Sequence, residues 1–141
     1  MSRAVRWKLH LSSPPEAVWE LIATDAGRER FWCETSRQEG EAIVMTFSNG
    51  WVEHAEILEA TRPARLAVRY FGTPVTFTLT PDGSGGTDLE LGHEGIRDED
   101  WDEVLPGWLN VLFPLKAMAD HGVDLRNHDP SRSWDEGYAD A

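Results

Sequence analysis

Two histidines stand beside carboxylates in the sequence and are the first places to look for acid–base chemistry. His54 lies between Glu53 and Glu56, and His93 is followed directly by Glu94. An imidazole titrates near neutral pH, so a histidine oriented by a carboxylate can act as a general base. Neighbouring residues of a strand, however, point to opposite faces of the sheet. If both segments are strands, the pattern favours structural histidines over local catalytic pairs, and a pair formed across the sheet stays open.

Metal and nucleophile chemistry find less support. The histidines at positions 10, 54, 93, 121 and 128 are scattered and form neither a helix-spaced pair nor a cysteine–histidine cluster. We therefore expect no metal and no cofactor. Cys33 is the single cysteine, which excludes an internal disulfide, and its apolar neighbours Phe31 and Trp32 predict a buried thiol with a raised pKa. No nucleophile-elbow pattern occurs, so we assign no catalytic residue.

The composition indicates one globular domain. The chain has 141 residues, of which 40% are hydrophobic, and its 13 Lys plus Arg and 25 Asp plus Glu give a formal net charge of −12. This length is typical of a domain with one core. The negative charge opposes binding to nucleic acid and to anionic membranes. No apolar run approaches the roughly 20 residues of a membrane-spanning helix, and the N-terminus lacks the apolar block of a secretory signal, so we expect a cytoplasmic protein.

The elements that must position these residues begin with a strand and two short helices. Apolar residues occupy every second position of residues 5–11, which predicts a half-buried strand. Ser13 and Glu16 have the spacing of a capping box, and Pro14 suits the first helical position. A second short helix is predicted from Thr24 to about residue 32, because threonine is a good helix cap.

Strands follow. Asn49-Gly50 is a strong signal for a tight hairpin turn. Residues 66–70 and 75–79 alternate between apolar and polar side chains, as neighbouring antiparallel strands do, and Gly72 marks the turn between them. The glycine-rich segment 81–86 is not followed by a helix, so it predicts a hairpin loop and not a phosphate-binding loop.

The last predicted element is a long helix. Apolar residues from Trp101 to Met118 follow the i, i+3, i+4 spacing of one buried stripe. Pro106 and Pro114 predict a lead-in turn and a kink, and Gly122 is placed to end the helix. The segment 108–115 is almost continuously apolar, which predicts that a second side of the helix is covered, either by the core or by a dimer contact.

The remaining segment, residues 123–141, is polar and has no period, which predicts a loosely ordered tail pinned by Trp134 or Tyr138. From Glu94 to the end there are twelve acidic and four basic residues. This charge is typical of a solvated surface, and the alternative is a surface that docks a basic protein partner.

The order of these elements resembles the START-like superfamily, and within it the heat-shock protein 90 ATPase activator homologue family in its small bacterial members. The resemblance spans Val5 to Gly122 and rests on SPPEAVWELIAT, FW, SNG with Trp51, EILEATRPARL, GGTDLEL and GW...LK. It implies an α+β helix-grip fold, in which a curved antiparallel sheet wraps around a long C-terminal helix and two short helices close one end. It also implies a domain at residues 1–122 followed by a polar tail at 123–141.

A sheet wrapped around a helix encloses a concave, mostly apolar volume of the kind that binds small molecules. We predict a hydrophobic or aromatic ligand there. Tyr70, His93 and Trp108 carry polar groups that can orient such a ligand, whereas the alternative for the remaining side chains is simple core packing. The predicted lining residues are Val68, Tyr70, Val75, Phe77, Leu79, Leu89, Leu91, His93, Trp108 and Leu112.

Three functions stay open at this point. The first is a START-like domain that binds a small apolar ligand without catalysis. The second is an enzyme of the polyketide cyclase or hydrolase type that uses His93 or His54 together with Tyr70. The third, implied by the family alone, is a co-chaperone-like module whose acidic surface engages a chaperone. We expect a monomer or a weak dimer.

Overall fold

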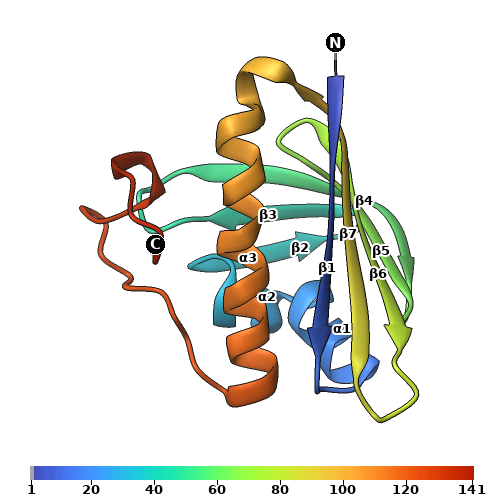
Figure 1. The fold of residues 1–141 in the computed structure, drawn as a ribbon. Coiled ribbons are helices and arrows are strands. Elements are labelled where there is room, and N and C mark those ends of the chain that lie inside the picture. Colours follow the sequence, from blue (N-terminus) through green and yellow to red (C-terminus); the bar gives the residue numbers. More distant parts are fainter. Residues whose placement is uncertain (1) are drawn as a thin grey trace.

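A curved antiparallel sheet wraps around one long helix (Figure 1). The computed structural model describes residues 2–141. The strands and helices, in chain order, are β1 (Ser2–Leu11), α1 (Pro15–Ala23), α2 (Asp25–Phe31), β2 (Thr35–Glu39), β3 (Ala42–Thr46), β4 (Val52–Thr61), β5 (Arg65–Tyr70), β6 (Thr73–Pro81), β7 (Thr87–Arg97) and α3 (Trp101–His121), with short 3-10 helices at Asp98–Asp100 and Trp134–Glu136. The sheet has seven strands in the order β1-β7-β6-β5-β4-β3-β2. This is the predicted α+β helix-grip fold.

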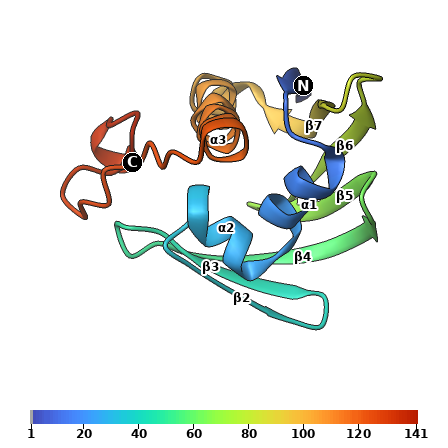
Figure 2. The ribbon, with the colours of Figure 1, turned by 90° about the horizontal axis from the view of Figure 1, so that it is seen from below.

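The helices lie on the concave face of the sheet. Seen from below, the sheet curves from β1 round to β2 and β3, α3 crosses its open side, and α1 and α2 occupy one end (Figure 2). The buried core lies between the sheet and these three helices. Among residues 2–141, no helix is both long and apolar enough to cross a membrane.

The start of α1 differs from the prediction. Pro14 is the N-cap, and no side chain caps the helix, so the capping box predicted from Ser13 is wrong. The Ser13 hydroxyl instead donates to the backbone oxygen of Ala119 at 2.6 Å and contacts the Asp120 carboxylate at 2.8 Å. The side chain of Ser13 therefore ties the β1–α1 connection to the end of α3. The predicted cap of α2 is confirmed, because the Thr24 hydroxyl accepts a hydrogen bond from the Gly27 amide at 3.0 Å.

The two short helices are joined to β2 through a buried arginine. Arg28 is only 1% exposed, and its guanidinium donates to Asp25, to the Ser36 hydroxyl and to the backbone oxygen of Ile22. A buried guanidinium is tolerated where its N–H groups have hydrogen-bond acceptors and its charge has a carboxylate partner. Gly27 permits the close approach of the two helices, since an added Cβ would lie 1.9 Å from a backbone oxygen of α1.

The long helix runs without interruption through both prolines. The lead-in turn is the 3-10 helix at 98–100, before Trp101, and not a turn immediately before Pro106. Gly122 ends α3 in the left-handed conformation with φ of 65°, as predicted. The tight turn at Asn49-Gly50 is confirmed too, because Gly50 has φ of 86° and its amide donates to the Phe47 carbonyl.

The segment after α3 folds back along the molecule. It leaves the lower end of α3 and rises to the loop between β3 and β4 (Figure 1), with the C-terminal residues beside α3 (Figure 2). Trp134, one of the two residues expected to pin this segment, packs edge-to-face on Trp51 with ring centroids 6.3 Å apart. Residues 123–141 are therefore docked on the domain and not loosely ordered.

Candidate ligand site between sheet and helix

The ten predicted lining residues come together on the concave side of the molecule. Strand register places Val68 opposite Val75 and Val75 opposite His93, so these three residues form one row across β5, β6 and β7. Phe77 and Leu91 form part of the next row. Trp108 and Leu112 approach from α3. All ten side chains are buried, and nine of them, all except His93, belong to one hydrophobic cluster. Their role as a ligand site stays a prediction, because packing of a closed core requires the same burial.

Aromatic rings form the centre of this cluster. The Trp32 ring lies 5.4 Å from Tyr70, 5.8 Å from Phe77 and 6.4 Å from Trp108, measured between centroids. These pairs are edge-to-face, the arrangement that the ring quadrupoles favour. Trp32 was not among the predicted lining residues. Its position directly after α2, beside a second aromatic residue, was the available signal.

His93 is held by hydrogen bonds at both ring nitrogens. The Trp108 indole N–H donates to His93 Nδ1 at 2.8 Å, and His93 Nε2 lies 2.5 Å from Thr73 Oγ1. An indole nitrogen is always a donor, so Nδ1 must be the acceptor, and the neutral ring carries its proton on Nε2. The Thr73 hydroxyl oxygen accepts a hydrogen bond from that N–H, and the Thr73 hydroxyl donates to the Tyr70 carbonyl at 3.3 Å. Thr73 is a second residue that the sequence did not point to.

This network keeps the imidazole neutral. Burial lowers the pKa of His93 below its ordinary value. Protonation of His93 at Nδ1 would also bring its new N–H against the Trp108 indole N–H, and two donors cannot form a hydrogen bond with each other. Because both nitrogens are engaged and the ring is uncharged, the geometry gives His93 a structural role and no free lone pair for a general base.

Tyr70 presents a buried hydroxyl to the aromatic cluster. Its oxygen accepts a hydrogen bond from the Trp32 indole N–H at 3.3 Å. The hydroxyl proton has no acceptor among residues 2–141 within hydrogen-bonding distance. Burial raises the pKa of Tyr70, so the phenol stays protonated and remains a donor. Tyr70 can therefore donate to an oxygen atom of a bound molecule.

The Glu53–His54 pair divides between the two faces of β4, as predicted. Glu53 is buried, while His54 is exposed. The Glu53 carboxylate accepts the Phe71 amide at 2.9 Å and lies 3.4 Å from the Trp51 indole nitrogen. Phe71 has φ of 48°, an uncommon conformation for a residue other than glycine. Glu53 thus stabilises a strained turn between β5 and β6.

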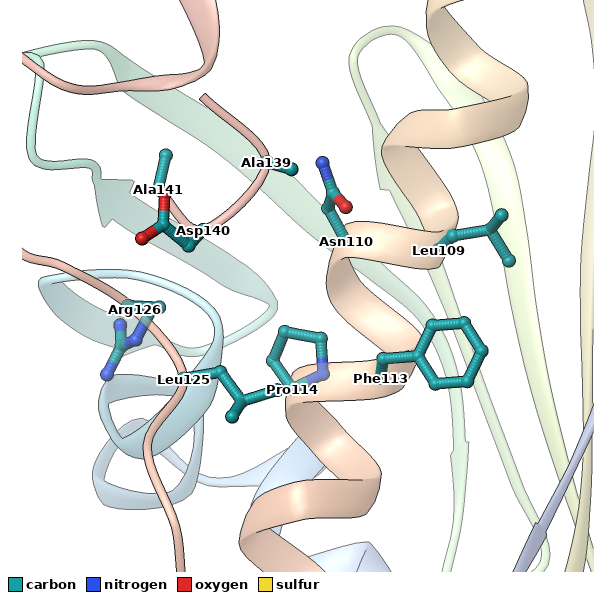
Figure 3. Close-up of a pocket in the computed structure, with 9 residues that line it drawn as sticks. All are labelled: Leu109, Asn110, Phe113, Pro114, Leu125, Arg126, Ala139, Asp140 and Ala141. Atoms are coloured by element: carbon teal, nitrogen blue, oxygen red, sulfur yellow. The ribbon is translucent and has the colours of Figure 1, made fainter. Parts of the chain in front are cut away.

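Open volume lies on the other side of α3. A groove of about 210 Å³ separates α3 from residues 123–141 (Figure 3). Leu125 points across it toward Pro114, and Asn110 points toward Ala139 (Figure 3). A second cleft, of about 20 Å³, is lined by Trp32, Cys33, Glu34, Phe47, Ser48, Arg126, Trp134 and Ala141. Of the ten predicted lining residues, none borders either space.

Cys33 has the environment expected from its apolar neighbours. It is buried, and burial raises the pKa of its thiol to about 12. A thiol with such a pKa is almost entirely protonated at neutral pH and is a poor nucleophile. The predicted burial of Cys33 and its raised pKa are confirmed, and its slow reaction with alkylating reagents stays a prediction.

Comparisons with solved structures show the same fold in proteins of low sequence identity. The protein SSP2350 from Staphylococcus saprophyticus superposes with a TM-score of 0.77 at 21% identity, covering 88% of this chain and 96% of that one. The Aha1 dimer from Colwellia psychrerythraea, solved in solution, has a TM-score of 0.77 at 16% identity, covering 85% and 98%. DynU16, a protein of the dynemicin biosynthetic locus, has a TM-score of 0.73 at 21% identity, covering 92% of this chain and 49% of that one.

These identities establish similarity of fold alone. No curated protein matches the sequence significantly. The sequence model of Activator of Hsp90 ATPase homolog 1-like proteins matches residues 12–120, which include every element from α1 to nearly the end of α3. The chain therefore belongs to the Activator of Hsp90 ATPase homolog 1-like family.

Proposed function

We propose that this protein binds a small aromatic or hydrophobic molecule with an oxygen acceptor in the interior between α3 and the sheet. The observation that carries the proposal is the Tyr70 hydroxyl, whose proton is donated to none of the residues from 2 to 141 although the group is buried among aromatic rings. The hydroxyl oxygen already accepts from Trp32, so the hydrogen bond that is missing is the one its proton would donate, and a hydrogen bond of this kind contributes about 1 kcal/mol. A ligand carbonyl or phenolic oxygen placed at Tyr70 would recover that energy.

The surrounding residues suit a flat, apolar molecule. Trp32, Phe77 and Trp108 offer ring faces and edges, and the rows of β5, β6 and β7 side chains offer an aliphatic floor. A ligand that buries about 300 Å² of apolar surface gains about 7 kcal/mol. The closed packing of the cluster means that side chains must move to admit it. This rearrangement and the lost freedom of the ligand reduce the net gain, so we expect micromolar or weaker affinity.

A two-dimensional amide NMR titration tests the proposal. The panel contains fatty acids, sterols, flavonoids and polyketide-like aromatics, and each is added to the wild-type protein and to Tyr70→Phe. We expect saturable shifts at Tyr70, at residues 89–93 and at Trp108. Loss of the hydroxyl should weaken an oxygen-bearing ligand about tenfold, which corresponds to roughly 1.4 kcal/mol. Tyr138→Phe, which removes an exposed hydroxyl, is the control and should change nothing.

A well-dispersed spectrum with no saturable response to any member of the panel would refute the proposal. Saturable shifts confined to Asn110, Phe113 and Leu125 would place the ligand in the outer groove and refute the role given to Tyr70.

The enzyme and co-chaperone alternatives have less support from the geometry. A cyclase or hydrolase needs a free acid or base, yet both nitrogens of His93 are hydrogen-bonded and His54 is exposed on the other face of β4 from Glu53. DynU16, which shares this fold, comes from a biosynthetic locus. For that reason the panel includes polyketide-like aromatics. A chaperone partner stays a prediction from the family, and a pull-down that enriches a chaperone would support it.

A further inference from the structure

We propose that residues 123–141 form a lid over the entrance to this interior, and that a ligand enters between α3 and the β3–β4 hairpin when the lid lifts. The inference rests on the proposed function, because it names the route to the same site. We call residues 123–141 the lid from here on.

The other side of α3 is closed by regular structure. There, the Lys116 ammonium group donates to the backbone oxygen of His10 in β1 at 2.5 Å. Asp120 accepts the backbone amides of Ser12 and Ser13 at 3.0 and 3.1 Å. These bonds join α3 to the edge of the sheet, while α1 and α2 cover the lower end (Figure 2). The lid lies between α3 and the β3–β4 loop (Figure 1), and it contains no α-helix or β-strand.

Directly beneath the lid lies a member of the aromatic cluster. The 20 Å³ cleft is bordered on the domain side by Trp32, Cys33 and Phe47, and on the lid side by Arg126 and Trp134. Trp32 is also the ring that contacts Tyr70 and donates to its hydroxyl oxygen. Lifting the lid would therefore expose Trp32, which contacts Tyr70, the residue proposed to donate to the ligand.

One latch of the lid is Arg126. Its guanidinium donates to the backbone oxygens of Cys33 at 2.7 Å and Glu29 at 2.8 Å, and it is oriented by Asp124 at 2.9 Å. The side chain is 5% exposed. Since Glu29 lies in the last turn of α2 and Cys33 follows the helix, Arg126 fixes the lid to the end of α2.

A second latch lies farther along the lid. Trp134 packs on Trp51, and Asn49 donates to Asp135 at 3.3 Å, so the β3–β4 hairpin holds the 3-10 turn of the lid. A third contact is the ring of His128, which bridges Glu34 at 2.6 Å and Asp124 at 2.7 Å.

The lid is attached weakly compared with the core. Among residues 123–141, Ser133 is the one residue that is buried. The large apolar residues of the lid remain 41–47% exposed, and the 210 Å³ groove lies between the lid and α3. Exposed ion pairs contribute about 0–1 kcal/mol each, and segments with few buried contacts open at lower free energy than the whole domain unfolds. The lid is therefore suited to open while the domain stays folded.

Cys33 is a natural reporter of lid opening. It is the single cysteine, it is 1% exposed, and it borders the cleft beneath the lid. The labelling rate of Cys33 by methyl methanethiosulfonate is measured in the full chain at increasing urea concentrations. Arg126→Ala removes a latch. Arg62→Ala is the matched control, because Arg62 is also bonded to two groups, Glu16 and Glu20, but on the α1 side of the fold.

We expect Arg126→Ala to raise the labelling rate at low urea at least tenfold, with a weak dependence on urea, while Arg62→Ala leaves the rate unchanged. Trp134→Ala, which removes an exposed ring, provides a second variant should Arg126→Ala not fold. If Cys33 is labelled only at the rate and urea dependence of global unfolding in the wild type and in the lid variants, the lid does not open separately and the proposal is overturned.

The gating role is tested by stopped-flow binding of 1-anilinonaphthalene-8-sulfonate, followed by quenching of tryptophan fluorescence. A gate predicts that Arg126→Ala raises the association and dissociation rates together, each at least fivefold, with the dissociation constant changed less than threefold. Saturable binding with an unchanged association rate would overturn the gate while leaving the proposed function intact. If neither protein binds the dye although Cys33 labelling shows that the lid opens, the proposed function fails and the gate fails with it. The lid would then be mobile without controlling access to a ligand site.

Discussion

Replacement of Trp108 by phenylalanine tests the network at the centre of the molecule. The change keeps an aromatic ring in the cluster but removes the indole N–H that His93 Nδ1 accepts at 2.8 Å. The imidazole stays buried beneath α3, so its acceptor is left without a partner. We expect the variant to be folded and less stable, with a histidine that is easier to protonate.

The expected loss follows from two contributions. An unpaired buried acceptor costs on the order of 1–3 kcal/mol. The phenylalanine ring is about 40 Å³ smaller, which at about 24 cal/mol per Å³ of cavity adds about 1 kcal/mol. The sum is about 2–4 kcal/mol. A chain of this length has a stability of about 7–20 kcal/mol, so the variant should remain folded.

Urea unfolding followed by circular dichroism measures the first effect, and NMR titration of the His93 ring measures the second. With the indole donor gone, a proton on Nδ1 no longer opposes another N–H, so the pKa of His93 should rise toward its ordinary value. Trp51→Phe is the control, since that ring is 47% exposed and its nitrogen is 3.4 Å from Glu53. A loss below about 0.5 kcal/mol for Trp108→Phe, together with an unchanged titration, would contradict the assigned tautomer and network.

Three further predictions follow from the helices and histidines. Gly27→Ala should lower the unfolding free energy by about 3 kcal/mol or more, whereas Gly107→Ala, with open space around its added methyl, should raise it by up to about 1 kcal/mol, and urea unfolding compares the two. Arg28→Ala should cost about 3–5 kcal/mol because it empties a fully buried position and leaves the Ser36 hydroxyl and the Ile22 carbonyl without this donor, while Asp25 is partly exposed and adds less. A loss of unfolding free energy below about 1 kcal/mol in urea would show that the guanidinium is dispensable. Stability measured from pH 5 to 8 should contain two opposing contributions. Burial lowers the pKa of His93, so the unfolded chain binds the proton first and stability falls as the pH drops below about 6.5. Hydrogen bonds to carboxylates, with Asp124 first, raise the pKa of His128, so its contribution is full below about 6.5 and is lost as the pH rises through the folded-state pKa. His93→Gln and His128→Gln should therefore change the slope of stability against pH in opposite directions, and equal slopes in both variants would contradict these assignments.

Much of the fold is predictable because local chemistry specifies it. Alternation along residues 66–70 and 75–79 predicts neighbouring strands, and the structure pairs these residues as β5 and β6. Gly50 and Gly122 have positive φ, which few residues other than glycine adopt, so the ends of the corresponding elements can be predicted from residue type. The eight predicted lining residues on strands share one buried face for the same reason, since a period of two assigns a strand residue to one face without knowledge of its partner.

Other features require contacts between distant segments. The cap expected from Ser13 fails because its hydroxyl finds Asp120, more than one hundred positions later in the chain. The cluster position of Trp32 depends on where α2 docks against the sheet, and no local pattern encodes this.

Periodicity and residue type alone predicted the individual strands and helices, the shared face of the strand residues and the burial of Cys33, because each depends on neighbours within a few positions. The helix-grip arrangement of these elements was implied by their order and by the resemblance to a known superfamily. The neutral state of His93, the unused hydroxyl proton of Tyr70 and the docking of the lid through Arg126 became visible in three dimensions. Hydrogen bonds are directional and short, so which groups are satisfied depends on the relative placement of segments that the chain separates by tens of residues.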